Sequence, residues 1–489
     1  MGPHRARVSA LGLAPKLGED RVLTGIAIDS RAVRRGFMFA ALPGSRVHGA
    51  TFAGTAIAQG AAVILTDAEG ARLLPDTDLP VIVVEDAREA IARAASLWFG
   101  AQPARMVAVT GTNGKTSVAT FTRQIWEALD HPAINIGTTG VEGAWHAPSS
   151  HTTPDPITLH AMLHAAAGAG VTHAAMEASS HGLDQRRLDG VHLCAGAFTN
   201  LTQDHLDYHH TMQAYFDAKA ALFTRLMPGD AVAVINLNGA KGSDMAELAL
   251  SRGMRVLTVG HGDGADLRLL SQRFDATGQD LRFAWQGQPF LTRLNLVGGF
   301  QAENVAVAAG LAIASGDDPQ AVFATLPKLT GVRGRMQLAA TRTNGAAVYV
   351  DYAHTPDAIE TALRALRPHV MGRIVIVFGA GGDRDSTKRP LMGAAASAHA
   401  DVVYVTDDNP RSEDPAAIRA AIMAACPDAT EVGDRAEAIL RGVDCLQPGD
   451  ALLIAGKGHE TGQTIAGQVY PFDDVEQASI TVAALDGVI

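Results

Sequence analysis

The glycine-rich stretch from Thr110 to Thr116 reads Thr-Gly-Thr-Asn-Gly-Lys-Thr and carries the groups that phosphate chemistry needs. It follows an apolar run at residues 106–110 and precedes a helical pattern at residues 115–129. Backbone N–H groups of such a loop bind phosphate, its lysine reaches the terminal phosphates, and its threonine hydroxyl can bind Mg²⁺. Only two residues follow Gly111 before the Gly-Lys pair, where the usual P-loop has four. A helix-capping turn is the alternative, but the strand–loop–helix context favours nucleotide binding.

Polar residues also follow two later strand patterns. Glu177 ends one such run, and His205 comes shortly after the next. The carboxyl ends of neighbouring parallel strands share one edge of a sheet, so both side chains are expected near Thr116. A carboxylate and a hydroxyl suit Mg²⁺, whereas histidine is an unusual ligand for so hard an ion. The chain has 18 histidines, and His209 and His210 are interpreted as ordinary structural groups.

The elements that must position these residues alternate between strand and helix. A length of 489 residues, at about 100–200 residues per domain, indicates about three domains. The alternation predicts an α/β fold with parallel, doubly wound sheets. The run 271–296 alternates polar and apolar residues and predicts antiparallel strands. The parallel strands are expected at residues 24–29, 37–40, 61–66, 80–84, 106–110, 174–177, 194–199, 231–236, 255–259, 347–351, 373–378, 401–406 and 450–455.

Composition excludes several classes of protein. Lys and Arg number 40 against 51 Asp and Glu, so the formal net charge is −11, which does not suit a nucleic-acid-binding protein. The three cysteines form no CxxC motif, so neither disulfides nor a cysteine zinc site is expected. The first 20 residues lack an apolar signal core, and no apolar run is long enough to span a bilayer. A cytoplasmic protein without membrane insertion is therefore expected.

The loop at residues 111–116 resembles the phosphate loop of the Mur ligases and of the related folylpolyglutamate synthetases. Further motifs in the same order extend the resemblance over nearly the whole chain, including the stretch at 28–44, which resembles a uridine-nucleotide-binding domain. The resemblance implies three domains. They are a small α/β UDP-binding domain at 1–102, a central P-loop ATPase domain with a doubly wound parallel sheet at 103–331, and a C-terminal Rossmann-like, amino-acid-binding domain at 332–489.

The resemblance also implies an ATP site, a Mg²⁺ site and four catalytic residues. The Tyr-x-x-x-Lys pattern ending at Lys219 matches a lysine that carries a carbamate made with CO₂. One departure is Gln301, where the family often has asparagine. The implied catalytic residues are Lys115, Lys219, His205 and His354. The implied ATP contacts are Gly111, Thr112, Asn113, Gly114, Lys115, Thr116, Asn304, Arg335 and Asp351, and the implied metal ligands are Thr116, Glu177, His205 and Lys219 as its carbamate.

Two substrate sites follow from the same resemblance. A UDP-muramoyl dipeptide is expected to contact Ser30, Thr152, Thr153, Ser179, Gln185 and Arg187. The stretch Asp-Asn-Pro-Arg at 408–411 resembles the signature of ligases that add meso-diaminopimelate. The residues expected to bind this amino acid are Arg389, Asp408, Asn409, Pro410, Arg411, Gly456 and Glu460.

The far end of diaminopimelate carries a carboxylate and an ammonium group, and these residue types suit both. Arg389 and Arg411 can hold the carboxylate, and Glu460 can hold the ammonium. Lysine lacks the far carboxylate, so it would leave a buried arginine unpaired, and such sites discriminate by about 10⁴ or more. A surface Asn-Pro turn with a solvated arginine is the alternative interpretation of Arg411.

The implied function is an ATP-dependent, ADP-forming ligase of cell-wall peptidoglycan synthesis. It would add meso-diaminopimelate to UDP-N-acetylmuramoyl-L-alanyl-D-glutamate through an acyl phosphate, with Mg²⁺ and ATP. Only small-molecule partners and a monomeric state are expected. The alternatives are a Mur ligase that adds lysine or D-alanyl-D-alanine, a folylpolyglutamate synthetase, and a P-loop ATPase without ligase activity. The carboxyl ends of two separate parallel sheets are expected to face each other, so that the activated acid meets the amine.

Overall fold

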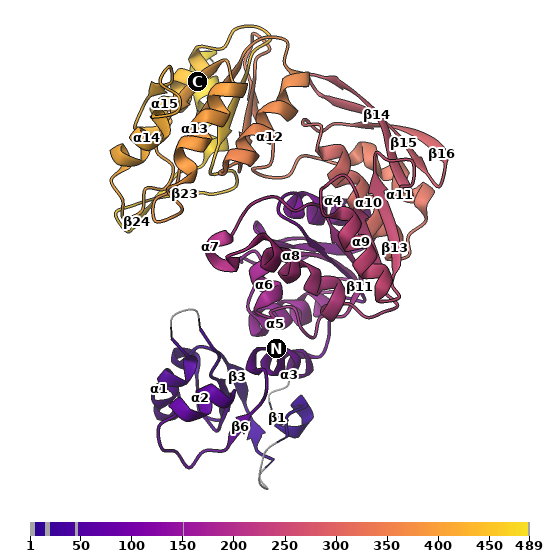
Figure 1. The fold of residues 1–489 in the computed structure, drawn as a ribbon, viewed down its shortest axis with the longest axis vertical. Helices are drawn as coiled ribbons and strands as arrows, with labels where there is room; N and C mark the ends of the chain where they lie inside the picture. Colours follow the sequence, from indigo (N-terminus) through magenta and orange to yellow (C-terminus); the bar gives the residue numbers. More distant parts are fainter. Residues whose placement is uncertain (1–4, 15–19, 45–46, 150, 488–489) are drawn as a thin grey trace. The chain divides into compact units, whose positions relative to one another are not determined.

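The computed structural model describes residues 5–14, 20–44, 47–149 and 151–487. The chain divides into two compact units. Unit 1 comprises residues 1–258 and 307–319, and unit 2 comprises residues 259–306 and 320–489. Figure 1 labels their helices and strands.

The first part of unit 1 is a four-stranded parallel sheet. Its strands lie in the order β3 (Gly25–Ala27), β4 (Phe37–Ala40), β5 (Val63–Thr66) and β6 (Val81–Val83), and all four match expected strands. Helices cover the sheet, because its strands are apolar on both faces. These helices are α1 (Ala53–Ala58), α2 (Ala68–Leu73) and α3 (Ala87–Phe99), and a short hairpin pairs β1 (Ala6–Arg7) with β2 (Val22–Leu23).

The second sheet of unit 1 carries the phosphate loop. Strand β7 (Arg105–Thr110) lies between β10 (His173–Glu177) and β11 (Leu193–Phe198), and all three are parallel. Outside them lie β8 (Ala133–Gly137), antiparallel β9 (Gly140–Gly143), β12 (Val232–Asn236) and β13 (Arg255–Gly260). The sequence patterns missed β8 and β9. Because β10 and β11 flank β7, their carboxyl ends lie beside the loop, as expected.

The helices of this second sheet follow the strand–helix alternation. Helix α4 (Lys115–Ala128) begins at the loop, and α6 (Ser180–Asp184) packs on α8 (Met212–Ala221). The expected helix at residues 212–226 is α-helical only to Ala221, because residues 222–226 form a π-helical turn. The remaining helices are α5 (Pro156–Gly168), α7 (Leu206–His209) and α9 (Gly242–Ser251).

Unit 2 begins with an antiparallel meander and continues into a third sheet. The meander of β14 (Leu267–Asp275), β15 (Gly278–Trp285) and β16 (Gln288–Leu294) confirms the alternating pattern of that region. The helices α10 (Gln301–Ala314) and α11 (Pro319–Thr325) follow along the chain. The third sheet has the order β17 (Gln337–Thr341), β18 (Ala347–Asp351), β22 (Ala451–Ala455), β19 (Ile374–Phe378), β20 (Val402–Val405) and β21 (Thr430–Glu431).

The third sheet is doubly wound, with five parallel strands and β17 antiparallel at its edge. Alternate residues of β19 point to opposite faces, so Ile374 and Ile376 pack with one helix layer, and Val375 and Val377 with the other. The first layer contains α12 (Pro356–Leu366), α13 (Lys388–His399) and α14 (Pro415–Met423), and the second contains α15 (Arg435–Asp444) and α16 (Asp474–Leu485).

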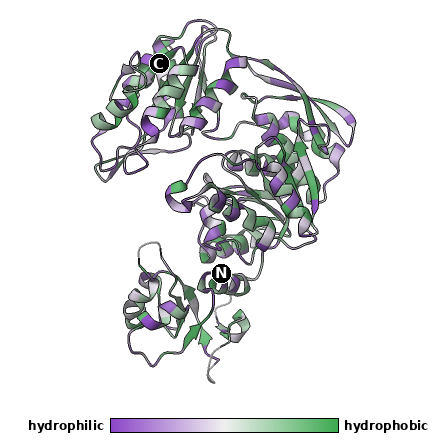
Figure 2. Cartoon of the chain, viewed as in Figure 1, coloured by the Kyte–Doolittle hydropathy of each residue, from purple (hydrophilic) through white to green (hydrophobic). Residues whose placement is uncertain are grey.

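Hydropathy follows these layers. Figure 2 shows hydrophobic residues concentrated on the strands, whereas hydrophilic residues mark the loops and the outer faces of helices. In the described part of the chain, the three larger sheets consist mainly of parallel strands with helices on them, which confirms the expected α/β fold. Among the described residues, no helix combines the length and the apolar character that crossing a membrane would need.

Candidate active site

The phosphate loop joins β7 to α4 and is shaped by two glycines with left-handed φ angles, Gly111 (146°) and Gly114 (88°). A Cβ on Gly111 would lie 1.9 Å from the Oγ1 of Thr199, so only glycine fits there. The Thr199 hydroxyl donates to the Asn113 carbonyl at 2.6 Å, and the Asn113 N–H donates to Asn200 Oδ1 at 2.9 Å. The residues after β11 therefore hold the loop open at the N-terminus of α4.

Two lysines converge on this loop. Lys115 Nζ donates to the carbonyls of Gly111 (2.9 Å) and Thr112 (2.8 Å), and the buried Lys219 donates to Gly111 at 2.7 Å. Burial, together with the charge of Lys115, holds the pKa of Lys219 well below its usual range. The Nζ atom of Lys219 also lies 4.3 Å from the ring centroid of Tyr215. A buried amine whose pKa is low has a large neutral fraction, which is the form that reacts with CO₂.

Glu177 ends β10 and is buried next to the loop-bearing strand. Its Oε1 accepts from the N–H of Thr138 at 2.8 Å, and its Oε2 lies 3.3 Å from the Thr138 hydroxyl. A Cβ on Gly137 would lie 2.0 Å from that same Oε1. The carboxylate is thus fixed by the end of β8, which the sequence patterns did not identify as a strand.

Five of the six expected dipeptide contacts form one hydrogen-bonded network with Glu177 as its centre. Thr153 Oγ1 donates to the Glu177 carbonyl at 3.0 Å and lies 3.0 Å from Ser179 Oγ. Arg187 donates to the Thr153 carbonyl at 2.7 Å and to Gln185 Oε1 at 2.8 Å. The remaining member, Thr152, lies 3.1 Å from the hydroxyl of Thr138.

Ser30, the sixth expected contact, lies in the first sheet of unit 1. It is buried in a short 3₁₀ turn at Ser30–Ala32 after β3, and Asp29 caps this turn. None of the hydrogen bonds described above connects it to the network around Glu177.

His205 lies at the start of α7 with a left-handed φ of 53°. Burial lowers its pKa to about 4, although Asp204 opposes this effect. Its ring centroid lies 4.9 Å from that of His181, and the neighbouring His209 is buried. Within the described part of the chain, no group of three or more His, Cys, Asp or Glu side chains could hold a metal ion.

The remaining expected nucleotide contacts lie in unit 2. Asp351 ends β18, where its carboxylate accepts from the N–H groups of Met336 (2.6 Å) and Ala353 (2.8 Å). Burial raises the pKa of Asp351, and Arg335 beside it acts in the opposite direction. The guanidinium of Arg335 lies 4.6 Å from the ring centroid of Tyr352.

Hydrogen bonds to neighbouring residues of unit 2 also position His354 and Asn304. His354 Nδ1 lies 2.8 Å from the Tyr352 carbonyl, and the His354 carbonyl accepts from Lys388 at 2.9 Å. Asn304 lies on α10 and donates to Gln301 Oε1 at 3.1 Å. Gln301, which departs from the family pattern, thus contacts Asn304, one of the expected ATP contacts, directly.

The residues expected to bind diaminopimelate come together at the carboxyl ends of β19, β20 and β22. Asn409 donates to Asp408 Oδ1 at 3.0 Å and to Glu460 Oε2 at 2.8 Å. A Cβ on Gly456, whose φ is 113°, would lie 2.4 Å from Asp408 Oδ2. The carbonyl oxygen of Pro410 lies against Gly382, because a Cβ added to Gly382 would come within 1.9 Å of this oxygen.

Two arginines lie on the other side of this cluster. Arg411 donates to the Gly382 carbonyl at 2.7 Å, and no ion pair joins it to a carboxylate among the described residues. Arg389 is buried and donates to Glu413 Oε1 at 2.8 Å, while its Nε is buried without a hydrogen-bond partner in the described part of the chain. Guanidinium donors that the protein does not satisfy are suited to a ligand carboxylate.

Comparison with known proteins gives the family. Three family models match: the Mur ligase family catalytic domain at residues 22–98, the Mur ligase middle domain at 109–312, and the Mur ligase glutamate ligase domain at 334–458. The chain belongs to the Mur ligase family. It is 52% identical to a protein of Caulobacter vibrioides, with 96% of each chain covered, and 51% identical to one of Bradyrhizobium diazoefficiens, with 94% and 95% covered. Both relatives are named UDP-N-acetylmuramoyl-L-alanyl-D-glutamate–2,6-diaminopimelate ligase.

Solved structures of Mur ligases resemble the chain as well. A structure of a UDP-N-acetylmuramoyl-L-alanyl-D-glutamate–2,6-diaminopimelate ligase matches with a TM-score of 0.71 at 35% identity, covering 98% of this chain and 99% of that one. MurF from Acinetobacter baumannii matches with a TM-score of 0.65 at 18% identity, covering 93% and 96%, which shows the shared fold. The comparisons therefore confirm the resemblance that the phosphate loop indicated.

Three further residues contact the expected site residues but were not identified from the sequence. Thr138 fixes Glu177, Glu413 pairs with Arg389, and Lys457 contacts Glu460 at 3.1 Å. Lys457 stands in the Gly-Lys-Gly-His-Glu stretch, whose glycine and glutamate were singled out. Its position beside them was the only signal that could have pointed to it.

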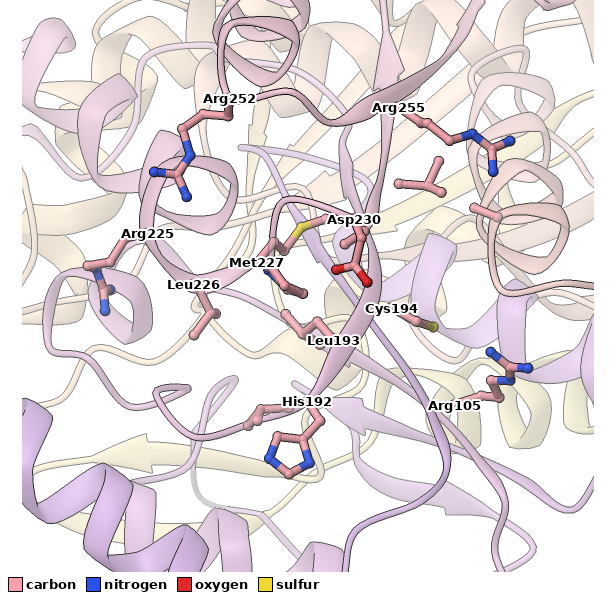
Figure 3. A pocket seen from close by; sticks show the side chains of 15 residues that line it. Arg105, His192, Leu193, Cys194, Arg225, Leu226, Met227, Asp230, Arg252 and Arg255 are labelled. Carbon is pink, nitrogen blue, oxygen red and sulfur yellow. The ribbon is translucent and has the colours of Figure 1, made fainter. Parts of the chain in front are cut away.

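A separate pocket of about 780 Å³ lies at the opposite, amino-terminal ends of the central strands in unit 1. Arg105, Arg225, Arg252 and Arg255 stand around it, but their guanidinium groups point in different directions (Figure 3). Arg225 is already paired with Asp189. Because this pocket lies at the amino-terminal strand ends, it is separate from the carboxyl ends that carry the phosphate loop.

Proposed function

We propose that this Mur ligase adds meso-diaminopimelate to UDP-N-acetylmuramoyl-L-alanyl-D-glutamate, with consumption of ATP, in peptidoglycan synthesis. The observation that carries the proposal is the cluster around residues 408–411. Its Asn409 holds the partly exposed Glu460 carboxylate, and the Arg389 and Arg411 guanidinium groups bond to Glu413 and to the Gly382 carbonyl. This cluster suits the far carboxylate and ammonium of diaminopimelate. The names of the relatives in Caulobacter and Bradyrhizobium support the same amino acid.

The reaction forms an amide in two balanced steps. The γ-carboxylate of D-glutamate attacks the γ-phosphorus of ATP, which gives an acyl phosphate and ADP. The neutral amine of diaminopimelate then attacks the acyl carbon, so that the amide forms, the phosphate leaves, and the amine loses its proton. Lys115 and the N–H groups of residues 111–116 are placed to stabilise charge on the transferring phosphoryl group.

The residues around the loop suit a hydrated divalent cation bound together with nucleotide phosphates. Thr116 and Glu177 would hold Mg²⁺ with oxygen atoms, which this hard ion prefers. When bound, Mg²⁺ neutralises the developing charge on the phosphates. Lys219 would support the site as a carbamate, since its buried amine can combine with CO₂ and release a proton. His205, whose low pKa keeps its imidazole neutral near pH 7, would serve as the remaining metal ligand and lie among the catalytic groups.

The other assignments follow from the same function. The network of Thr152, Thr153, Ser179, Gln185 and Arg187 would bind the muramoyl dipeptide, and Ser30 would contact its uridine nucleotide. Asn304, Arg335 and Asp351 would contact ATP, and His354 would lie among the catalytic groups. We assign UDP binding to residues 1–102, ATP binding to 103–331 and amino-acid binding to 332–489, and the matched family models support this order. We also propose that the protein acts in the cytoplasm as a monomer on small-molecule substrates.

A phosphate-release assay tests the function. The purified protein is mixed with ATP, Mg²⁺ and the UDP-muramoyl dipeptide, and then with diaminopimelate, lysine or D-alanyl-D-alanine in separate reactions. Phosphate release that needs both the dipeptide and diaminopimelate supports the proposal. Preference for lysine or D-alanyl-D-alanine would assign the protein to another branch of the family, and turnover without any acceptor would indicate a plain ATPase.

A further inference from the structure

Lys457 is a fully buried lysine (0% exposed) just after β22, and the proposed function does not use it. Its ammonium donates to three oxygens: the Gly462 carbonyl at 2.5 Å, Glu460 Oε2 at 3.1 Å and Asn409 Oδ1 at 3.4 Å. An ammonium group has three donors, and all three are used inside unit 2. Lys457 therefore has no donor left for a substrate and must act through its neighbours.

The neighbour that matters most is Glu460. Its Oε2 accepts from both Lys457 and the Asn409 amide, whereas no hydrogen bond to a described residue involves its Oε1. The Glu460 side chain is 32% exposed. One carboxylate oxygen is thus fixed by the protein, and the other remains available for an ammonium ligand.

Asn409 is held from the same side. Its amide nitrogen donates to Asp408 and Glu460, and its carbonyl oxygen accepts from the Thr464 N–H at 2.8 Å as well as from Lys457. Both amide hydrogens and both acceptor positions are used, which fixes the orientation of the amide. Lys457 and Asn409 therefore form one frame that holds Glu460 in place.

Charge explains why the frame needs a lysine. Asp408 and Glu460 both bond to the same asparagine amide, and two carboxylates this near would repel each other. With Lys457 included, the formal charges of the three groups sum to −1, which matches one ammonium ligand. A buried cation also offsets the cost of removing the two carboxylates from water.

The carboxylate side of the site carries two guanidinium groups, those of Arg389 and Arg411. Glu413 is bonded to Arg389, and Asp383 lies near Arg411. Carboxylates on one side and guanidinium groups on the other suit the ammonium and the carboxylate at the far end of diaminopimelate.

We propose that Lys457 is a positioning residue that fixes the Glu460 carboxylate for the far ammonium group of diaminopimelate. The inference rests on the proposed function and deepens it, because it identifies what sets the amine half of the specificity. The step is one of binding geometry and balance of charge, and no bond is formed or broken.

The test is a double-mutant cycle between Lys457→Met and Glu460→Gln. Lys457→Met should raise the KM for diaminopimelate about 10-fold or more, while the KM values for ATP and the UDP-dipeptide change by less than about twofold. In the Glu460→Gln background the same substitution should add less than about twofold, because its target is already removed. Additive effects, or equal increases in all three KM values, would overturn the proposal. Lys328→Met, at an exposed lysine of the same unit, is the matched control.

A second variant and a second substrate protect the test from a folding defect. Lys457→Gln keeps an amide nitrogen with two donor hydrogens but removes the charge, and it should show a smaller increase in the same KM. With 2-aminopimelate, which lacks the far amine, neither substitution should matter. An equal loss with both amino acids would contradict the proposal, and failure of both variants to fold would assign Lys457 to folding and overturn it too. Absence of phosphate release by the wild-type protein with diaminopimelate would instead refute the proposed function.

Discussion

The selection of diaminopimelate over lysine should depend on Arg411. Its backbone has a left-handed φ of 52°, which asparagine tolerates better than alanine, so Arg411→Asn removes the guanidinium with little backbone strain. The backbone bonds of residue 411, from its N–H to the Thr464 carbonyl and to its carbonyl from the Ala466 N–H, remain possible in this variant. The substitution therefore removes the charge and leaves the loop in place.

The magnitude follows from the donors that are lost. Arg411 gives one hydrogen bond to Gly382 and has no carboxylate partner among the described residues, so its other donors are available to the substrate. Each hydrogen bond to a charged group contributes about 1.5–3 kcal/mol. Loss of two such bonds, about 3–6 kcal/mol, should raise the KM for diaminopimelate about 10²- to 10⁴-fold. Lysine has no far carboxylate, so its use should change by less than about threefold, and the discrimination of about 10⁴ should fall to about 100 or less.

Phosphate release at saturating ATP and UDP-dipeptide, with diaminopimelate or lysine varied, measures both quantities. Arg364→Asn is a matched control, because Arg364 forms an exposed ion pair with Glu360 on α12 of the same unit. The reasoning is refuted if Arg411→Asn raises the KM for ATP as much as that for diaminopimelate. It is also refuted if the discrimination against lysine stays at its wild-type value.

Three other perturbations address unit 1. Gly137→Ala would place a Cβ 2.0 Å from Glu177 Oε1 and should lower kcat about tenfold or more, with the KM for diaminopimelate nearly unchanged. Steady-state kinetics measures both constants, and an unchanged kcat would show that Glu177 has no part in phosphoryl transfer. Lys219→Gln should lower kcat about 10²-fold or more, and the wild-type protein should lose activity in CO₂-depleted buffer and regain it with bicarbonate, so activity that ignores bicarbonate would speak against the carbamate. Burial holds the pKa of His160 at about 4, below the ordinary value of about 6.5, so its neutral form stabilises the fold above pH 6.5 and this contribution is lost as the pH falls towards 4. Between pH 7.5 and 5 the loss should be about 2 kcal/mol in the free energy of unfolding, and denaturant titrations should find it reduced in His160→Gln, whereas an unchanged pH dependence would disprove this role.

Much of the fold was predictable because its signals are local. The strand at 37–40 was expected with the bounds that the structure shows, and β18, β19 and β22 differ from expectation by no more than one residue at an end. The runs are apolar because parallel strands are covered on both faces, and glycines or polar residues mark their ends. The meander at 267–294 was recognised by its alternating pattern, which only strands with one covered face show.

The missed elements lacked such a signal. Strand β8 is a short run interrupted by Asn135, whose side chain accepts from Arg123 at 2.6 Å, so its polar residue is explained only by a partner 12 positions earlier. The hairpin of β23 (Gly462–Ile465) and β24 (Gln468–Pro471) mixes polar and apolar residues, and its residues are half-buried in β23 and exposed in β24, so no clear period marks it. The π-helical turn at 222–226 continues a good helical pattern, so its sequence does not distinguish it from α-helix.

The candidate sites divide in the same way. The amino-acid sequence by itself determined the family and predicted the phosphate loop and most residues of the candidate sites, because each of these depends on groups that stand within a few positions of one another. Only the tertiary structure decided that Thr138 fixes Glu177, that Lys219 reaches Gly111, and that Lys457 bonds to both Glu460 and Asn409. The residues that these contacts join lie up to 108 positions apart in the chain. Their geometry depends on strand order and burial, which arise from packing and cannot be deduced from local spacing.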